Sequence, residues 1–353
     1  MENHIRKFMI LCLIIIFGYA VIDTIINVNY IDVDSNSNKL NKVKEDISSK
    51  VEDIDNTIHI DDIHIKGNSV SKEETIEIDK LIEEDECIDT SNPIFDKNIN
   101  IIDRINNYLG NDKGSTSFMY YNLVTKETIS FNEDLYMDAA SLYKVGLGIV
   151  VYNMINNDEI RLEDLVYYSP WQYQGGTGIL QYDLTFGALP VSTLVEYSIK
   201  YSDNIAATML YSYIGGWSNF KFRLFEILGI DYGDYNNVTS ARIELEVLKY
   251  IYENRNNPNY NTLIEYLKNT EFHDRLDKYL PKDIVAHKIG SNEGYTHDIG
   301  IIFTEDPYII IMMTDNVYNS PDKIADISKE MYLYNIGNTK IKIRTPNHEF
   351  QLK

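Results

Sequence analysis

The sequence predicts an α/β protein in an α+β arrangement, in which one antiparallel sheet is flanked by helices. Strand-like patterns occur at both ends of the globular part, and helical spacing fills residues 139–280 between them. Strands that enclose a helical middle are joined most simply in one sheet, with the mostly helical subdomain inserted. The strand patterns occupy residues 117–123, 127–132, 283–291, 295–304 and 307–316.

The other elements of the globular part follow from local signals. Residues 98–109 have helical spacing, and Thr125 with Lys126 forms the turn between the first two strands. The last helix opens at Ser320, a good N-cap residue, with Pro321 in the first helical position. We therefore expect a globular domain over residues 93–353. Its sheet subdomain comprises residues 93–138 and 281–353, and its helical subdomain comprises residues 139–280.

Residues 1–30 have the pattern of a transmembrane signal-anchor. Arg6 and Lys7 precede an uncharged apolar run that extends, with its continuation, close to the ~20 residues that cross a bilayer. A cleaved signal peptide is the alternative, but Ala20 begins only a poor cleavage site. Because basic residues precede the run and acidic residues follow it, we expect a single-pass protein of the cell membrane whose globular domain lies outside the cytoplasm.

The composition limits the possible partners. Residues 31–92 hold 18 acidic and 7 basic residues without a sustained period, which predicts an acidic disordered linker. The net charge of −22 over 353 residues argues against binding to nucleic acid, whose phosphates require clustered basic residues. Cys12 and Cys87 both precede the globular part, so no disulfide can cross-link it. We expect that domain to be a monomer.

Ser141 and Lys144 are three positions apart at the start of an apolar run. On a helix this spacing puts both side chains on one face. Burial of an ammonium group is costly, but a lysine that desolvation keeps neutral can remove the proton of a serine hydroxyl. The alternative is chance, since Ser320 and Lys323 have the same spacing at what is read as a simple helix cap.

Two further segments carry polar groups of interest. Ser202, Asp203 and Asn204 enter another helical stretch, where the simplest alternative is an N-cap. Lys288 and Gly290 stand on a predicted strand, where a glycine would let a substrate backbone approach closely.

In this order the three segments resemble the motifs of the penicillin-recognising serine hydrolases, specifically the class A β-lactamase-like family. The motifs are S-x-x-K at residues 141–144, S-D-N at 202–204 and K-x-G at 288–290. The resemblance covers roughly residues 98–335 and includes the stretch GGTGILQYD at 175–183. It implies a β-lactamase/transpeptidase-like fold and an acyl-enzyme mechanism.

The resemblance also implies roles for individual residues. Ser141 would be acylated, Lys144 would act as its base, and Ser202 would pass a proton to the departing nitrogen. Asn204 would bind the amide of the substrate and Lys288 its carboxylate. Substrate would lie along Gly290 and Ser291, with the backbone N–H groups of Ser141 and Ser291 as the oxyanion hole.

Two departures from the family pattern bear on the reaction. Ile289 replaces the usual hydroxyl residue of the third motif, and residues 295–304 contain no arginine, so carboxylate binding would be weaker or would use Ser291. The Glu-x-x-x-Asn pattern that serves deacylation in class A enzymes is missing between residues 217 and 241. Asp231 and Asp234 remain as substitute bases, and without one the acyl-enzyme would form but be released slowly.

We therefore expect an extracytoplasmic serine hydrolase that opens β-lactam rings. A D,D-peptidase, amidase or esterase on cell-wall peptides is one alternative, and a domain that binds β-lactams or peptidoglycan without turnover is another. No cofactor is expected. No metal is expected either, because the seven histidines lack close ligand spacing and His287 and His297 lie on predicted strands.

Overall fold

The computed structural model describes residues 99–231 and 236–344, with side chains up to residue 337. The predicted anchor at residues 1–30, the predicted linker at 31–92 and Asp234 lie outside the described residues. Among the helices that the structure describes, none is both long enough and apolar enough to cross a bilayer.

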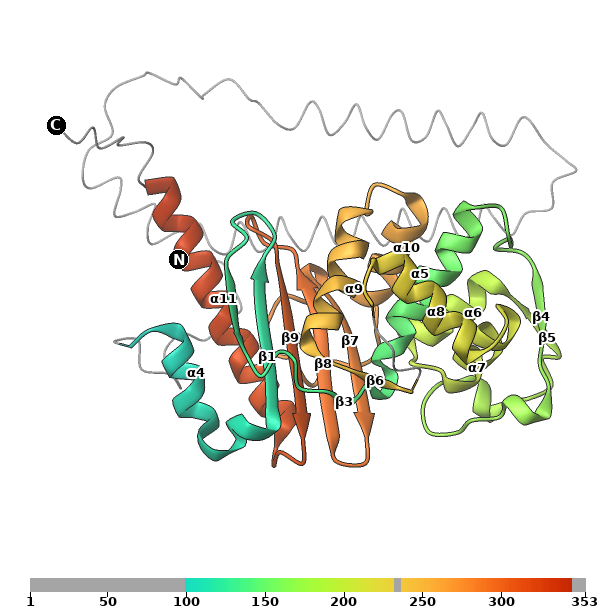
Figure 1. The fold of residues 1–353 in the computed structure, drawn as a ribbon, viewed down its shortest axis with the longest axis horizontal. Helices are drawn as coiled ribbons and strands as arrows, with labels where there is room; N and C mark the ends of the chain where they lie inside the picture. The colour runs from blue at the N-terminus through green and yellow to red at the C-terminus, as the bar shows by residue number, and fades with distance from the viewer. Residues whose placement is uncertain (1–98, 232–235, 345–353) are drawn as a thin grey trace, which may run out of the picture. The chain divides into compact units, whose positions relative to one another are not determined.

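A five-stranded antiparallel sheet forms the centre of the domain, in the order β2-β1-β9-β8-β7 (Figure 1). The N-terminal strand β1 pairs along its whole length with the C-terminal strand β9. This pairing of the two ends confirms the predicted α+β fold class. The strands are β1 Thr116–Asn122, β2 Thr128–Phe131, β7 Val285–Asn292, β8 Tyr295–Ile302 and β9 Tyr308–Asp315.

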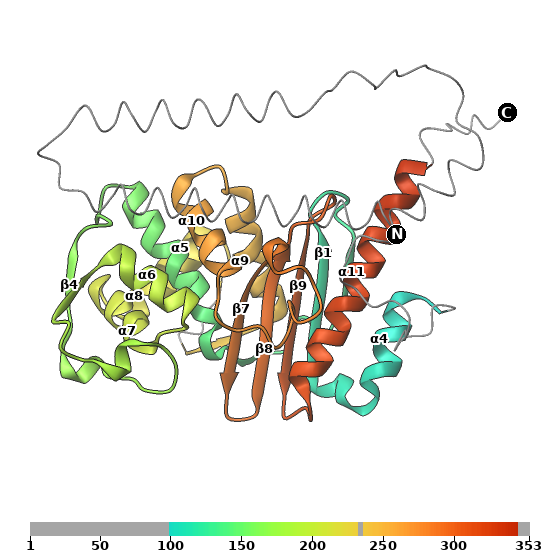
Figure 2. The ribbon, with the colours of Figure 1, turned by 180° about the vertical axis from the view of Figure 1, so that it is seen from behind.

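Helices cover both faces of this sheet because side chains alternate along its strands. Phe118 and Met312 share a core cluster with the helices α4 and α11, whereas Met119 and Ile311 belong to the opposite cluster, with α9. The helix α11 crosses the face that is seen in Figure 2. These helices are α4 Ile101–Leu109, α9 Ala241–Glu253 and α11 Ser320–Arg344. The position of α9 was not predicted, since its residues fall in the expected helical subdomain.

The helix α5, Tyr143–Asn156, is the buried centre of the helical part. It is apolar on almost every side, as expected for a helix enclosed by others. A Cβ atom at Gly146 would lie 2.6 Å from Leu224, so this glycine allows the close packing of α8 on α5. The surrounding helices are α6 Val191–Lys200, α7 Asn204–Tyr213, α8 Trp217–Leu228 and α10 Pro258–Lys268.

Two small two-stranded sheets were not predicted from the sequence, because strands of two or three residues give no periodic signal. One joins β4, Leu165–Tyr167, to β5, Ala188–Pro190. The other joins β3, Met137–Asp138, to β6, Val238–Thr239. The second pairing holds the connection between α8 and α9 against the residues that precede Ser141.

Candidate active site

Ser141 lies in a single 3-10 turn, Ala140–Leu142, that leads directly into α5. Ala140 has a φ of 46°, a left-handed conformation that costs about 1–2 kcal/mol for a residue with a Cβ atom. The strand β7 contacts this turn, because a Cβ atom at Gly290 would lie 3.0 Å from the Ala139 carbonyl oxygen and 3.2 Å from Leu142. Gly290 thus allows the strand to pack on the serine turn. That this glycine also admits a substrate backbone stays a prediction.

The amine of Lys144 is fully buried and points at Ser141. Its Nζ atom lies 3.0 Å from Ser141 Oγ, 2.5 Å from the Ser202 carbonyl oxygen and 3.2 Å from Ser202 Oγ. A further contact of 2.6 Å joins it to Asn204 Oδ1. All of these partners are neutral oxygens. A neutral amine can donate its two N–H bonds to the two nearest acceptors and turn its lone pair toward the Ser141 hydroxyl.

The surroundings of Lys144 favour this neutral form. Burial holds the pKa of the Lys144 amine well below its usual range, and the nearby charge of Lys288 lowers this pKa further. The carboxylate of Asp203 opposes these effects without reversing them. A buried amine with a lowered pKa is a suitable base for a serine hydroxyl.

The Ser202 hydroxyl stands between the two buried lysines. Its Oγ atom accepts a hydrogen bond of 2.8 Å from Lys288 Nζ and is also close to Lys144. Ser202 has a φ of 51°, so its backbone is held in an unfavourable left-handed conformation at this point. Burial lowers the pKa of Lys288 to about 7, with Asp298 opposing the shift and Arg275 adding to it. The hydroxyl can therefore relay a proton between two amines.

The structure assigns separate tasks to the residues of the S-D-N segment. Asp203 is the N-cap of α7, since its side chain accepts from the backbone N–H of Ala206 at 2.9 Å. Asn204 contacts Lys144 through Oδ1 and donates through Nδ2 to the Gly175 carbonyl at 2.8 Å. The N-cap alternative thus holds for Asp203, while its two neighbours face the lysine.

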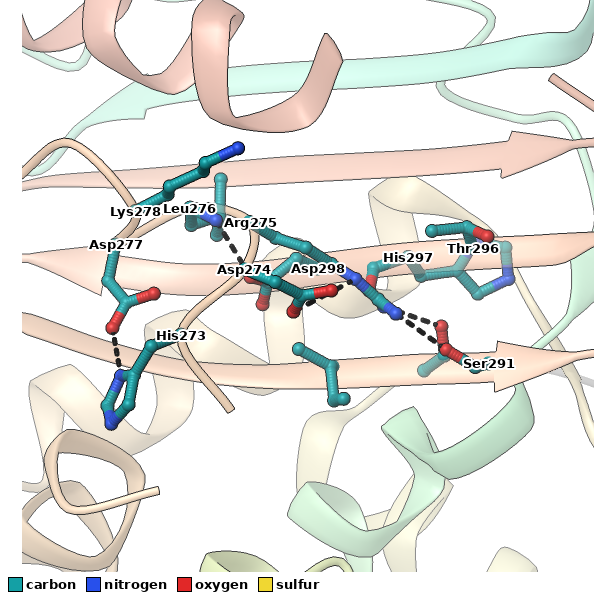
Figure 3. Close-up of polar contacts among 12 residues, drawn as sticks. His273, Asp274, Arg275, Leu276, Asp277, Lys278, Ser291, Thr296, His297 and Asp298 are labelled. Atoms are coloured by element: carbon teal, nitrogen blue, oxygen red, sulfur yellow. Dashed lines mark hydrogen bonds and ion pairs between the residues drawn. The ribbon is translucent and has the colours of Figure 1, made fainter. Parts of the chain in front are cut away.

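Arg275, which was not predicted from the sequence, reaches the end of β7 that carries Gly290 and Ser291. It lies in the segment between α10 and β7 and reaches toward Ser291 (Figure 3). Its Nη2 donates to Ser291 Oγ at 2.7 Å, and its Nη1 donates to the carbonyl oxygens of Gly290 and His297 at 3.0 and 2.6 Å. Arg275 lies outside residues 295–304, the predicted strand in which an arginine could have assisted. Nothing in the local sequence around Arg275 indicates its position.

The candidate deacylation bases do not join this cluster in the described residues. Asp231 follows α8, is exposed and makes no hydrogen bond to Ser141 or Lys144 within the described ranges, and Asp234 lies outside them. Instead, Asn237 contacts the serine turn. Its backbone oxygen accepts from Ala139 N–H at 2.8 Å, and its Nδ2 donates to the Ala140 carbonyl at 3.0 Å.

A small cavity lies beside the serine turn and has a free volume of about 20 Å³, room for about one water molecule. Two buried oxygens without a hydrogen-bond partner, Asn237 Oδ1 and Glu244 Oε2, belong to its lining residues. Burial raises the pKa of Glu244 to about 7, although a hydrogen bond from Thr239 and the charge of Lys221 partly offset the shift.

Comparison with known proteins supports the same relationship. The sequence model of the beta-lactamase enzyme family matches residues 100–335. The extended-spectrum beta-lactamase PER-1 of Pseudomonas aeruginosa is 23% identical over 241 residues, which cover 59% of this chain and 77% of PER-1. Among solved structures, PBP-A has a TM-score of 0.61 at 19% identity, covering 71% of this chain and 99% of that one. A beta-lactamase from Chitinophaga pinensis DSM 2588 has a TM-score of 0.61 at 21% identity, with coverages of 67% and 100%. With its S-x-x-K, S-D-N and K-x-G segments gathered in one site, this chain belongs to the beta-lactamase enzyme family.

Proposed function

We propose that this chain is a serine hydrolase that β-lactams acylate at Ser141 and that releases the acyl group slowly. The observation that carries this proposal is the position of Lys144. Its amine lies 3.0 Å from Ser141 Oγ, and its other contacts are to neutral oxygens. No ion pair in the described part of the chain holds this amine in its charged form.

The reaction follows from these contacts. Lys144 takes the proton of Ser141 as Oγ attacks the lactam carbonyl carbon, and a C–O bond forms. The ring C–N bond then breaks, and the nitrogen takes a proton from the Ser202 hydroxyl, which Lys144 reprotonates. Lys288 and Arg275 attract the carboxylate of the substrate, and Arg275 takes over the part that Ile289 cannot play.

Slow release is supported by the contact that the connection between α8 and α9 makes with the serine turn. Hydrolysis of the ester requires a base to activate a water molecule. Among the described residues of the connection between α8 and α9, the side chain that contacts this turn is the amide of Asn237, which cannot act as such a base. Asp231 and Asp234 stay candidates for a substitute base.

We also propose that residues 1–30 anchor the domain in the cell membrane and that it works outside the cytoplasm. The support is the charge pattern of the sequence, with Arg6 and Lys7 ahead of the apolar run. This location would give the site access to β-lactams and to cell-wall peptides. A domain that captures a β-lactam or a cell-wall peptide without turnover is the second candidate, favoured by the same neutral contact at Asn237.

Intact-mass measurement after exposure to benzylpenicillin tests the proposal, in parallel with nitrocefin hydrolysis. We expect one adduct per chain, mapped to Ser141, and slow turnover. A stable adduct without turnover would favour the capture alternative. Ser141→Ala should abolish the adduct, whereas the matched control Ser320→Ala, at the other Ser-x-x-Lys spacing, should keep it. An adduct on Ser141→Ala would overturn the proposal.

A further inference from the structure

His273, Asp277 and His287 lie together where the segment that follows α10 meets β7. Their ligating atoms are all within 4.8 Å of one another. His273 and His287 are 14 positions apart in the sequence, and only the fold makes them neighbours. The expectation that the chain holds no metal was based on linear spacing, and it does not account for this cluster.

Two buried polar atoms of the cluster have no hydrogen-bond partner. They are His287 Nε2 and Asp277 Oδ1, in side chains that are 1% and 2% exposed. Burial of such atoms without a partner costs about 1–3 kcal/mol each, so a ligand that binds them would remove a penalty. His287 Nε2 also lies 3.5 Å from Asp277 Oδ2. Ligands that surround Zn²⁺ tetrahedrally at ~2.0–2.1 Å lie about 3.3 Å apart, close to this separation.

The other ring nitrogen of His287, Nδ1, has a carboxylate partner of the kind found at metal-binding histidines. Its Nδ1 contacts the carboxylate of Asp298 at 2.9 and 3.0 Å, and that carboxylate accepts from the Leu276 N–H at 3.0 Å. Histidines that bind metals through Nε2 characteristically donate Nδ1–H to such a carboxylate, which fixes the ring and its tautomer. Asp298 would thus position His287 without binding the metal itself.

The open side of the cluster is formed by His273. Its side chain is 35% exposed and its Nδ1 contacts Asp277 (Figure 3). Solvent therefore reaches the cluster through His273, while Asp277 and His287 are buried. Two imidazoles and one carboxylate suit Zn²⁺ and related transition metals better than Mg²⁺ or Ca²⁺, which prefer oxygen ligands.

We propose that His273, Asp277 and His287 form a binding site for a divalent transition-metal ion of the Zn²⁺ type. The bound ion would join the segment after α10 to β7. In the sequence, Arg275 lies between His273 and Asp277. It donates hydrogen bonds to the Gly290 carbonyl oxygen and to Ser291 Oγ. Metal binding would therefore stabilise the segment that places Arg275 beside Ser291, where the carboxylate of the substrate is proposed to bind.

Isothermal titration of the metal-stripped full chain with Zn²⁺ tests this proposal. Visible absorption on Co²⁺ binding reports the ligand geometry. We expect one equivalent to bind, with a higher melting temperature, and Mg²⁺ to give neither effect. His273→Ala, at an exposed position, should weaken the affinity by more than about tenfold. His287→Gln should do the same.

Two controls make the result specific. Glu271→Gln removes an exposed charge two positions from His273 and should leave the affinity unchanged. The double variant His59→Ala/His64→Ala removes two histidines that are five positions apart in the sequence and should still bind one ion. The proposal is overturned if the wild-type chain shows no saturable Zn²⁺ binding, or if His273→Ala binds as tightly as the wild type. Neither readout depends on acyl-enzyme chemistry.

Discussion

Two regions that meet at the Ser141 turn differ in chemistry. On the side of α5, α7 and β7, two buried lysines and the Ser202 hydroxyl are linked by hydrogen bonds to one another and to Ser141. On the side of the connection between α8 and α9, the turn contacts a neutral amide, Asn237, and a water-sized cavity. The first region is equipped to move protons, whereas the side chain with which the described part of the second region contacts the turn is a neutral amide.

Under the proposed function, this difference places acylation and release in separate parts of the fold. Formation of the ester needs a base at Ser141, which the first region supplies. Its hydrolysis would need a base that activates water, and the Glu-x-x-x-Asn pattern that serves this step in class A enzymes is missing between residues 217 and 241. Each prediction below changes one of the two regions.

The largest effect is expected from Lys144→Met in the lysine-rich region. Removal of the base should lower the acylation rate by about 10²–10⁴-fold, the usual contribution of general base catalysis. Stopped-flow acylation by nitrocefin measures this rate. Lys221→Met removes another buried lysine, in α8, and should leave the rate nearly unchanged. Equal losses in both variants would show that the position of Lys144 is not special.

A smaller effect is expected from Arg275→Ala in the same region, where the carboxylate of the substrate is proposed to bind. Loss of a charged hydrogen bond worth about 1.5–3 kcal/mol should reduce kcat/KM roughly 10- to 100-fold for a β-lactam with a free carboxylate. The methyl ester of the same β-lactam should lose much less. If kcat/KM falls equally for the free acid and for the methyl ester, Arg275 supports the fold and does not bind the carboxylate.

The pH profile of acylation should have two limbs. At low pH the rate should fall because Lys144 takes up a proton and ceases to be a base. Above pH 7 the rate should fall more gently, because Lys288, whose pKa is about 7, loses the charge that attracts the carboxylate. Measurement of acylation from pH 5 to 9 checks both limbs. A rate that rises steadily above pH 7 would contradict the role of Lys288.

In the other region, Glu244→Gln should change stability rather than chemistry. The folded-state pKa of Glu244 is about 7, above its ordinary value of 4.5, so its contribution to stability is complete below pH 4.5 and is lost as pH rises toward 7. Glutamine does not ionise. The variant should therefore gain stability relative to wild type, on the order of 1–3 kcal/mol, between pH 4.5 and 7. Urea unfolding at pH 4.5 and at pH 7 measures the gain. The same difference in stability between variant and wild type at both pH values would contradict the prediction.

The smallest effect is expected from Asp231→Asn. Asp231 is exposed and makes no hydrogen bond to the serine cluster within the described residues, so the deacylation rate should not change. The decay of the acylated mass over time measures this rate. A marked slowing would identify Asp231 as the substitute base and would remove the contrast between the two regions.

The sequence was sufficient for features that repeat along the chain or follow a fixed motif order. The strand-like runs at both ends of the globular part predicted the sheet, and the three motifs predicted that Ser141, Ser202 and Lys288 meet. Arg275 and Asn237 could not be predicted, because their positions depend on the path of connections that have no periodic pattern. The packing of α9 on the sheet was missed for a similar reason, since helical spacing does not say which layer a helix covers.

The most direct test of the central claim is the time course of nitrocefin hydrolysis at high enzyme concentration. If acylation at Ser141 outpaces release, the product signal should show a rapid burst of one equivalent per chain, followed by a slower steady rate. The burst should disappear in Lys144→Met. A linear course from the first turnover, with no acylated chain in the intact mass, would contradict the account.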